Sequence, residues 1–314
     1  MTLSVVIGLS AVIVAIDDGE AVVLTVRQGE GPGRTTGLPF GPFDPAVRTF
    51  ELALRAFVSE QTRLDLGYVE QLYTFGDEGR DAPLADIGAG AARVLSVGYL
   101  ALRPEAAETG VSTTAWASWT RFFPWEDWRA GRPSVIDEVI APALTRWAKT
   151  SEERLGRARS LFALDGARWD EERVLERYEL LYESRLVAEA ARDRETGGVT
   201  PPGLGEAMIS DHRRILATGL GRLRGKLRYR PVVFDLMPPE FTLRALQRTV
   251  EAIAGVALHK QNFRRGLERT ELVEGLGRFD RQAGGRPAEV FRFRREQLGA
   301  GPPVGLALPL LRDA

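Results

Sequence analysis

Amide and cationic side chains crowd into one short stretch near the C-terminal end, residues 259–270 (HKQNFRRGLERT). Amide and guanidinium groups can read base edges in duplex DNA, Asn on adenine and Arg on guanine, and further Lys and Arg neutralise phosphates. Only Phe263 and Leu267, four residues apart, look buried, so the stretch predicts a recognition helix with one apolar stripe. Base contacts are expected from Asn262 and Arg265. The complete set of expected contacts in this helix is Lys260, Gln261, Asn262, Arg264, Arg265 and Arg269.

The segments on either side predict the rest of a winged helix-turn-helix. Thr242 is placed to cap a preceding helix whose apolar residues recur at three- and four-residue steps, and Gly255 is placed to end it. Beyond the recognition helix, two strands are expected around a Gly-rich basic turn at 281–287. Arg281 and Arg286 in this turn are expected to contact DNA from the wing. The competing interpretation is a helical pair and a hairpin of another small domain, with a solvated basic face.

The distribution of charge favours the DNA-binding interpretation. The 314 residues suffice for two domains, and 44% hydrophobic with 27% charged residues is ordinary for a globular protein. The net charge is −1, yet from Lys226 onward 16 Lys and Arg stand against 10 Asp and Glu. The remainder has 26 against 33. A basic C-terminal module on an acidic body is expected when one part of a protein meets nucleic acid.

Several classes of site are excluded by residue type. The chain has no cysteine, so disulfides and thiolate metal sites are absent, as in a reducing cytoplasm. With only His212 and His259, a histidine-rich metal site or a Ser-His-Asp triad is not expected. The apolar run from Leu3 to Ile16 is too short to span a bilayer and predicts a core hairpin strand. We therefore expect no metal, no cofactor, no catalytic residue, no membrane partner and a cytoplasmic location.

The first hundred residues predict an α+β fold. A hairpin at 4–27 is followed by a Gly- and Pro-rich loop, and Thr49 is placed to cap a helix from Phe50 to about Thr62. Strands are expected at 68–75 and 94–102.

The stretch GPFDPAVRTFELALRAFVSEQTRLDLGYVEQLYTFGDEGRD resembles the NadQ group of Nudix-related transcriptional regulators, which is related to the NrtR group. LHKQNFRRGLERTELVEGLG with GGRPAEVFRF resembles the winged helix that these regulators carry. The resemblance covers residues 1–125 and 207–295. It implies a Nudix-like α/β effector-binding domain at 1–228, with a helical insertion at about 130–205. A winged helix-turn-helix domain at 229–314 follows.

The Nudix-like helix departs from the hydrolytic pattern G-x5-E-x7-R-E-U-x-E-E-x-G-U, where U is a bulky apolar residue. Aligning EQTRL on EETGL places Phe57 and Gln61 where two glutamates stand, and Arg63 where a glycine stands. Of the motif glutamates only Glu60 survives. Several carboxylates are needed to hold Mg²⁺ on a pyrophosphate, so no hydrolase is expected.

The resemblance implies a repressor of NAD biosynthesis genes that binds operator DNA as a homodimer. Its effector would be an adenine nucleotide: NAD, ATP or ADP-ribose. The alternatives are a Nudix-type pyrophosphohydrolase of nucleotides and a nucleotide-sensing module that binds protein. The missing glutamates argue against the first alternative, and the basic C-terminal module argues against the second.

The effector is expected where a Nudix scaffold binds its nucleotide. Arg27 and Arg80 are candidates for the diphosphate, because guanidinium binds phosphate in a bidentate way. A surface ion pair with neighbouring aspartates is the alternative for Arg80. The candidates for stacking adenine are all aromatic, and for each of them core packing is the competing role: Phe40, Phe43, Tyr73 and Phe75.

The middle of the chain predicts helices around an aromatic cluster. TAWASWTRFFPWEDW suggests either a core cluster or a wall for a nucleotide base. Thr150 is expected to cap one following helix, and Asp170 to cap a long helix reaching about Arg194. These helices either pack on the first domain or form a dimer interface. A further helix at 206–227 and a connecting strand at 229–236 are expected before the winged helix.

Overall fold

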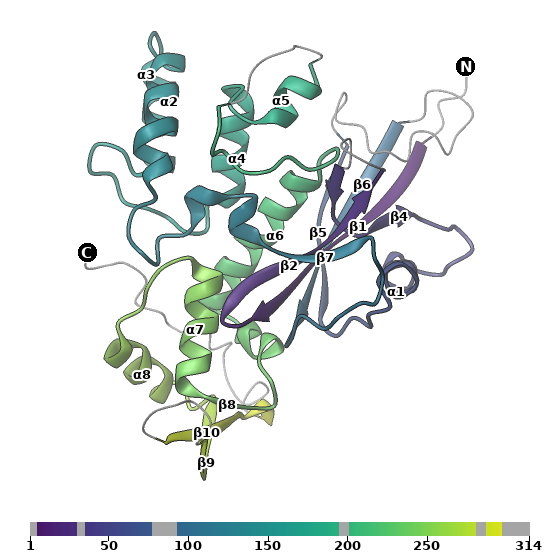
Figure 1. The fold of residues 1–314 in the computed structure, drawn as a ribbon, viewed down its shortest axis with the longest axis vertical. Helices are drawn as coiled ribbons and strands as arrows, with labels where there is room; N and C mark the ends of the chain where they lie inside the picture. The colour runs from purple at the N-terminus through teal and green to yellow at the C-terminus, as the bar shows by residue number, and fades with distance from the viewer. Residues whose placement is uncertain (1–4, 30–34, 77–92, 195–200, 281–286, 297–314) are drawn as a thin grey trace.

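A twisted mixed sheet forms the centre of the N-terminal part (Figure 1). The computed structural model describes residues 5–29, 35–76, 93–194, 201–280 and 287–296. Strand order is β3-β2-β1-β6-β5, with β4 paired to β1 and β7 paired to β2. The pair β1–β6 is parallel, and the other pairs are antiparallel. The strands are β1 (Val5–Asp17), β2 (Glu20–Gln28), β3 (Thr35–Gly37), β4 (Phe40–Pro42), β5 (Val69–Phe75), β6 (Arg93–Arg103) and β7 (Thr114–Ser118).

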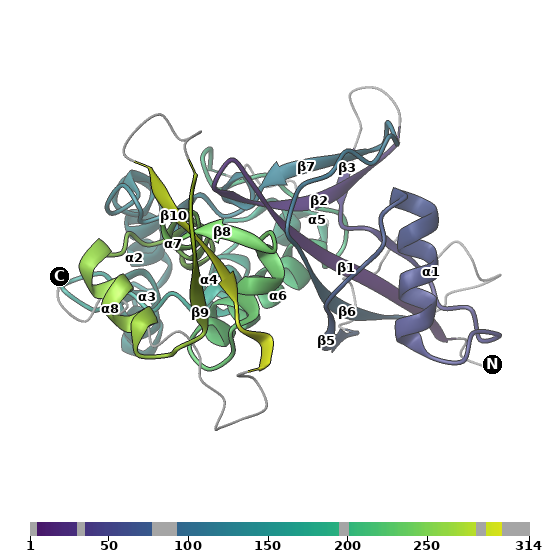
Figure 2. The same ribbon diagram turned by 90° about the horizontal axis from the view of Figure 1, so that it is seen from below.

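Helices cover both faces of this sheet, which explains why β1 is apolar along most of its length. On one face, Leu9 and Ile13 of β1 pack with α1 (Phe50–Thr62). On the other, Val12 and Val14 pack in the larger core cluster with α6 (His212–Leu227). Figure 2 shows α1 alone on one side of the sheet, with the remaining helices on the other. The predicted hairpin, helix and two strands at 68–75 and 94–102 are confirmed, including the Thr49 cap.

Four of the six aromatic side chains in the stretch 114–128 lie in the core. Trp119, Phe122, Phe123 and Trp125 are each at most 1% exposed, so their surfaces are not available to a ligand in this conformation. They share one core cluster with residues of the helices in the upper part of Figure 1. These are the π-helix η5 (Ile136–Ile140), α2 (Ala141–Trp147), α3 (Glu152–Phe162), α4 (Val174–Glu183) and α5 (Ala188–Arg192); 3-10 turns η3 (Trp119–Arg121) and η4 (Pro124–Glu126) precede them.

Two expectations about these helices are wrong. Ser151 rather than Thr150 caps α3, accepting a hydrogen bond from the Arg154 amide at 3.3 Å. The long helix expected from Asp170 to about Arg194 is two helices. The first of these, α4, ends at Glu183, and Arg185 just beyond it has a left-handed φ of 62°. No Gly or Pro marks this break, so the sequence carried no signal for it.

Helix α6 lies between the sheet and the insertion, close to both. A Cβ at Gly219 would lie 3.0 Å from Val12 of β1, and one at Gly221 would lie 2.9 Å from the Glu172 carbonyl oxygen. Glycine at both positions therefore permits the close packing. The helix begins at His212 rather than at 206. The strand expected at 229–236 is wrong: η6 (Val232–Leu236) is a 3-10 helix. It follows Pro231 and ends before Pro238, and a short apolar run does not distinguish helix from strand.

The C-terminal elements form the expected winged helix-turn-helix, at the bottom of Figure 1. Thr242 caps α7 (Leu243–Ala254), accepting from the Ala245 amide at 3.1 Å. Gly255 ends that helix with a φ of 71°. Recognition helix α8 (Lys260–Glu268) follows, then a three-stranded sheet of order β8-β10-β9: β8 (Glu240–Thr242), β9 (Val273–Asp280) and β10 (Ala288–Phe293).

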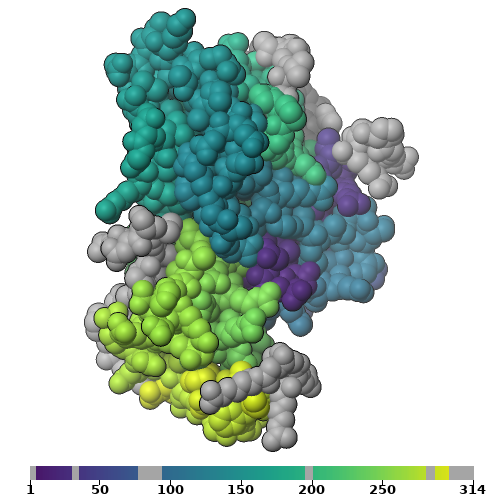
Figure 3. Space-filling view, turned by 60° about the vertical axis from the view of Figure 1, so that its left-hand side comes forward, coloured from purple at the N-terminus to yellow at the C-terminus, as the bar shows by residue number. Residues whose placement is uncertain are grey.

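The winged helix packs against the rest of the chain. In Figure 3 its yellow-green surface lies directly below the teal insertion, beside the purple tip of the β1–β2 hairpin. Arg248 of α7 donates a hydrogen bond to the Asp18 carbonyl at that tip, at 2.9 Å. Phe234 of η6 stacks on Phe293 of β10, with 4.1 Å between ring centroids.

No helix among the described residues is long and apolar enough to cross a membrane.

Candidate nucleic-acid interface and effector domain

Recognition helix α8 presents its polar residues to solvent. Phe263, Gly266 and Leu267 form its buried face. The six residues expected to contact DNA are all exposed: Lys260, Gln261, Asn262, Arg264, Arg265 and Arg269. None of their cationic groups has a salt-bridge partner among the described residues. The helix thus offers a basic, amide-bearing surface of the kind that enters a major groove.

The helical period refines which residues lie outermost. Gln261 and Arg265 are four apart, so they share one side of α8. At 100° per residue, this side lies opposite the buried stripe formed by Phe263 and Leu267. Asn262 lies on the flank of the exposed surface, on the side of Arg269. Base reading by Asn262 and Arg265 stays a prediction, and the geometry adds Gln261 as the neighbour of Arg265.

The start of α8 lacks a side-chain cap. His259 occupies the N-cap position with φ −68° and ψ 119°, and its ring accepts no hydrogen bond from the first turn. The turn before it is braced from α7 instead: Glu251 accepts from the Leu258 amide at 2.8 Å, and Gln247 donates to the Leu258 carbonyl at 2.9 Å. The helix entrance is therefore fixed by α7, while its free amides remain open to an anion.

The wing is formed by β9 and β10. Arg278 pairs with Glu240 at 2.5 Å, and Arg292 pairs with Glu274 across the hairpin. These ion pairs join the strands of the small sheet. Arg281 and Arg286, the predicted wing contacts, lie outside the described residues, and their role stays a prediction.

In the Nudix-like helix α1, the positions of two motif glutamates serve packing. The Gln61 amide donates to the Phe40 carbonyl at 3.3 Å, and its oxygen accepts from the Phe40 amide at 3.2 Å. A Cβ at Gly41 would lie 3.4 Å from the Phe57 ring, so Phe57 packs on β4. Arg63 has a φ of 58°, the left-handed conformation that suits the glycine of the hydrolytic motif. Among the described residues no group of His, Asp or Glu could hold a metal ion.

The predicted effector residues fall in different surroundings. Phe40 is 7% exposed and meets the His212 ring edge-on at 4.9 Å. Phe75 is 3% exposed and belongs to the core beneath α6. Phe43 packs on Phe50 of α1 at 4.6 Å, with the cluster on the opposite face of the sheet. Tyr73 is 64% exposed, and its ring meets that of Phe75 edge-on with 5.4 Å between centroids, so these two are the pair that the structure brings together. The four aromatics therefore do not form one wall in this structure.

Of the two arginines predicted to bind the diphosphate, one lies among the described residues. Arg27 is exposed on β2, where its backbone pairs with Thr36 of β3. Arg80 lies outside the described residues, as do 30–34 and 77–92. Effector binding by these residues stays a prediction.

Buried His212 is a titratable group beside Phe40 that the sequence did not single out as a site residue. Its Nδ1 accepts a hydrogen bond from the Leu38 amide at 3.0 Å. Burial, with the positive charge of Arg192, lowers its pKa from 6.5 to about 3. The imidazole is therefore neutral near pH 7 and holds the loop between β3 and β4 onto the start of α6.

A cavity of about 590 Å³ lies between the N-terminal part and the wing. Leu102 and Arg103 at the end of β6 line one side, and Phe234 and Phe293 line the other. None of the described predicted effector residues lines it. It is a feature of the boundary between the parts, distinct from the expected nucleotide site.

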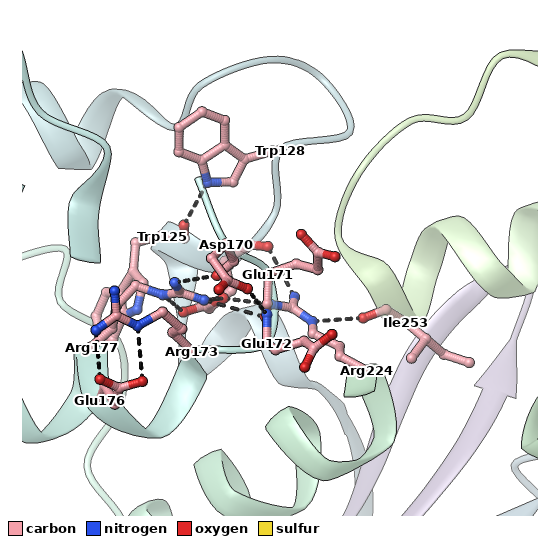
Figure 4. A network of polar contacts seen from close by, with 11 residues as sticks. Trp125, Trp128, Asp170, Glu171, Glu172, Arg173, Glu176, Arg177, Arg224 and Ile253 are labelled. Carbon is pink, nitrogen blue, oxygen red and sulfur yellow. Dashed lines mark hydrogen bonds and ion pairs between the residues drawn. The ribbon is translucent and has the colours of Figure 1, made fainter. Parts of the chain in front are cut away.

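A buried ionic network at the same boundary was missed by sequence reasoning (Figure 4). Glu126, Arg177 and Arg224 have fully buried side chains, and Glu126 forms ion pairs with both arginines. Burial alone would raise the pKa of Glu126, but the two guanidinium groups hold it below its usual range. The sequence offered one signal for this network. Arg224 directly follows Leu223, which belongs with Leu227 to the apolar stripe of α6.

The winged helix and the fold both have known counterparts. Residues 233–293 match the NrtR DNA-binding winged helix domain family. Over 99 residues the chain is 37% identical to the ADPR responsive transcriptional repressor NtrR of Acinetobacter baylyi. This match covers 32% of the chain and 39% of the relative, so it spans about two fifths of the relative's length.

Solved structures resemble the whole chain. Shewanella oneidensis NrtR complexed with a 27mer DNA has a TM-score of 0.55 and 20% identity, over 93% of this chain and 94% of that one. A second structure of Shewanella oneidensis NrtR has a TM-score of 0.54 and 19% identity, over 95% of this chain and 98% of that one. A MutT/nudix family protein of Enterococcus faecalis gives 0.53 and 14%, over 93% and 88%. The expected α+β fold, a Nudix-like domain followed by a winged helix, is confirmed.

Proposed function

We propose that this protein is a transcriptional repressor that binds operator DNA through its winged helix and is controlled by ADP-ribose. The observation that carries the proposal is α8: its cationic and amide residues are exposed, and only Phe263, Gly266 and Leu267 are buried. The match of residues 233–293 to a DNA-binding winged helix supports the same conclusion.

ADP-ribose is chosen among the three nucleotides because the relative from Acinetobacter baylyi is an ADPR responsive repressor. The resemblance to NadQ-type regulators supports NAD biosynthesis genes as the targets. NAD and ATP share the adenosine diphosphate portion and belong in the same binding test.

The Nudix-like domain acts by binding rather than by hydrolysis. Phe57 and Gln61 occupy motif glutamate positions and are engaged with Gly41 and Phe40. Glu60 alone supplies one carboxylate, which is too few for the Mg²⁺ cluster that polarises a pyrophosphate. Effector binding then shifts DNA binding through its different affinity for two arrangements of the DNA-binding modules.

The test begins with selection of a bound sequence from a random duplex pool by the purified protein. Fluorescence anisotropy then compares this sequence with a scrambled duplex across salt concentrations. We expect a tighter Kd for the selected duplex by about a thousandfold or more, and a steep loss of affinity with salt. Equal affinity for both duplexes, or formation of product from ADP-ribose and Mg²⁺, would overturn the proposal.

A further inference from the structure

The turn of the helix-turn-helix is held by buried groups from the effector domain and its insertion. Arg224 of α6 donates from Nε to the Ile253 carbonyl, in the last turn of α7, at 2.9 Å. Its other nitrogens donate to the Glu126 carboxylate at 2.6 Å, to the Glu126 carbonyl at 3.1 Å and to the Glu171 carbonyl at 2.8 Å. One guanidinium therefore joins α6, η4, the loop before α4, and the end of α7 (Figure 4).

A second contact holds the turn through its backbone. The Trp128 amide donates to the Gly255 carbonyl at 2.6 Å, and Trp128 pairs with Val256 as an isolated β-bridge. A Cβ at Gly255 would overlap the Glu126 carbonyl oxygen and lie 2.6 Å from the Arg224 guanidinium. Glycine is thus needed here for two reasons, the φ of 71° and the approach of the effector domain.

The insertion completes the arrangement. Arg177 of α4 binds the Glu126 carboxylate through Nε at 2.5 Å and through a second nitrogen at 2.8 Å. It also donates to the Asp170 carbonyl at 2.7 Å. Arg177 lies 3.8 Å from the Trp169 ring centroid, and Arg224 lies 4.4 Å from that of Trp119. A buried ionic network of this kind is weak evidence for stability, but it can fix a specific arrangement.

We infer that Glu126, Arg177 and Arg224 are positioning residues for DNA recognition, and that they transmit the effector signal from α6 to α8. The inference rests on the proposed function. Helix α8 begins at Lys260, five residues after Gly255, so a turn held at Ile253, Gly255 and Val256 fixes where α8 stands relative to the effector domain. If α6 or the insertion moves, either the turn moves with it or these hydrogen bonds break.

The first test compares two glycine variants. Gly255→Ala forces the turn away from Glu126. Gly166→Ala is the matched control, because Gly166 also has a positive φ, 81°, but a Cβ there would meet nothing within 4 Å. We expect Gly255→Ala to lower the preference for the selected duplex over a scrambled one by about tenfold or more, and Gly166→Ala to leave it unchanged.

A second variant removes the charges together: Glu126→Met with Arg177→Met and Arg224→Met. Replacing a whole buried network avoids an unpaired buried charge, so the fold should persist. Calorimetry on the full chain gives a readout that needs no DNA. The parent should unfold in one transition, and both the triple variant and Gly255→Ala should show a separate transition for the winged helix.

The outcomes separate this inference from the proposed function. If both altered proteins keep a single transition and the parent's sequence preference, the positioning role is wrong. If the parent binds no DNA specifically, the proposed function fails, while calorimetry still decides whether the network joins the two parts. Hydrogen exchange of the unaltered protein adds a final check: ADP-ribose should change protection at 126–128 and 253–258, and unchanged protection there with altered DNA binding would refute signal transmission by this route.

Discussion

At the scale of single residues, we predict that the exposed face of α8 determines DNA recognition. Replacing Asn262 or Arg265 by Ala should weaken binding of the selected duplex by about 1–3 kcal/mol and relax sequence preference at one position. Replacing Lys260 by Ala should weaken binding to all DNA sequences alike and reduce the slope of log K against log salt by about one unit. Arg168→Ala, an exposed residue before α4, is the control. Unchanged binding by both Asn262→Ala and Arg265→Ala would refute this docking.

His212 gives the chain a specific acid sensitivity. Its folded pKa of about 3 lies below the ordinary 6.5, so the folded state binds fewer protons than the unfolded state between these values. The stabilising contribution is complete above pH 6.5 and is lost as pH falls toward 3. At pH 5 the loss from His212 should be about 2 kcal/mol of unfolding free energy relative to pH 8.

Urea denaturation at several pH values checks this expectation. His212→Asn retains an oxygen that can accept from the Leu38 amide but does not titrate, so its stability should fall less between pH 8 and pH 5. Exposed Gln261→Asn removes no titratable group and is the control, so its stability should fall between pH 8 and pH 5 as the parent's does. Identical pH dependence of His212→Asn and the parent would contradict the assignment.

At the scale of elements, α8 lacks a side-chain cap of the kind that Thr242 gives α7. His259→Asp supplies a carboxylate cap, which should stabilise the free protein by about 1 kcal/mol and weaken DNA binding by repulsion from phosphate. His259→Ser supplies a neutral cap and should stabilise the protein with less effect on DNA binding. Thermal unfolding and anisotropy measure the two effects, and tighter DNA binding by His259→Asp would exclude this interpretation.

Capping residues and apolar periodicity correctly predicted the helices in which they lie. Thr49, Thr242 and Gly255 marked helix ends that the structure confirms, and the stripe of Phe263 and Leu267 gave the buried face of α8. The break after α4 was missed because Arg185 adopts a left-handed conformation without Gly or Pro nearby. Propensity and periodicity carry no information on such a break.

Long-range packing explains what else was missed. Gln61 and Phe57 were recognised as departures from a motif, but their contacts with Phe40 and Gly41 required coordinates. The Glu126 network joins residues from distant parts of the chain, and a single charged residue near an apolar stripe does not identify its partner. Likewise, Phe40 and Phe75 looked like candidates for stacking, whereas burial places both in cores.

At the scale of the whole molecule, one winged helix covers too little DNA for typical specific affinity. We therefore predict a homodimer, formed mainly by the first domain and its helical insertion. Sedimentation velocity at micromolar concentration, with and without the selected duplex, should show two chains per particle. A monomer under both conditions would contradict the prediction.

Control of DNA binding by one nucleotide site, without chemistry, is the mechanism that we propose. Its most direct test is anisotropy of the selected duplex with the full chain, titrated with ADP-ribose and, separately, with NAD and ATP. We expect ADP-ribose to change the apparent Kd by about tenfold or more, and chromatography to recover the nucleotide intact. An apparent Kd that stays constant at saturating ADP-ribose, NAD and ATP would contradict it.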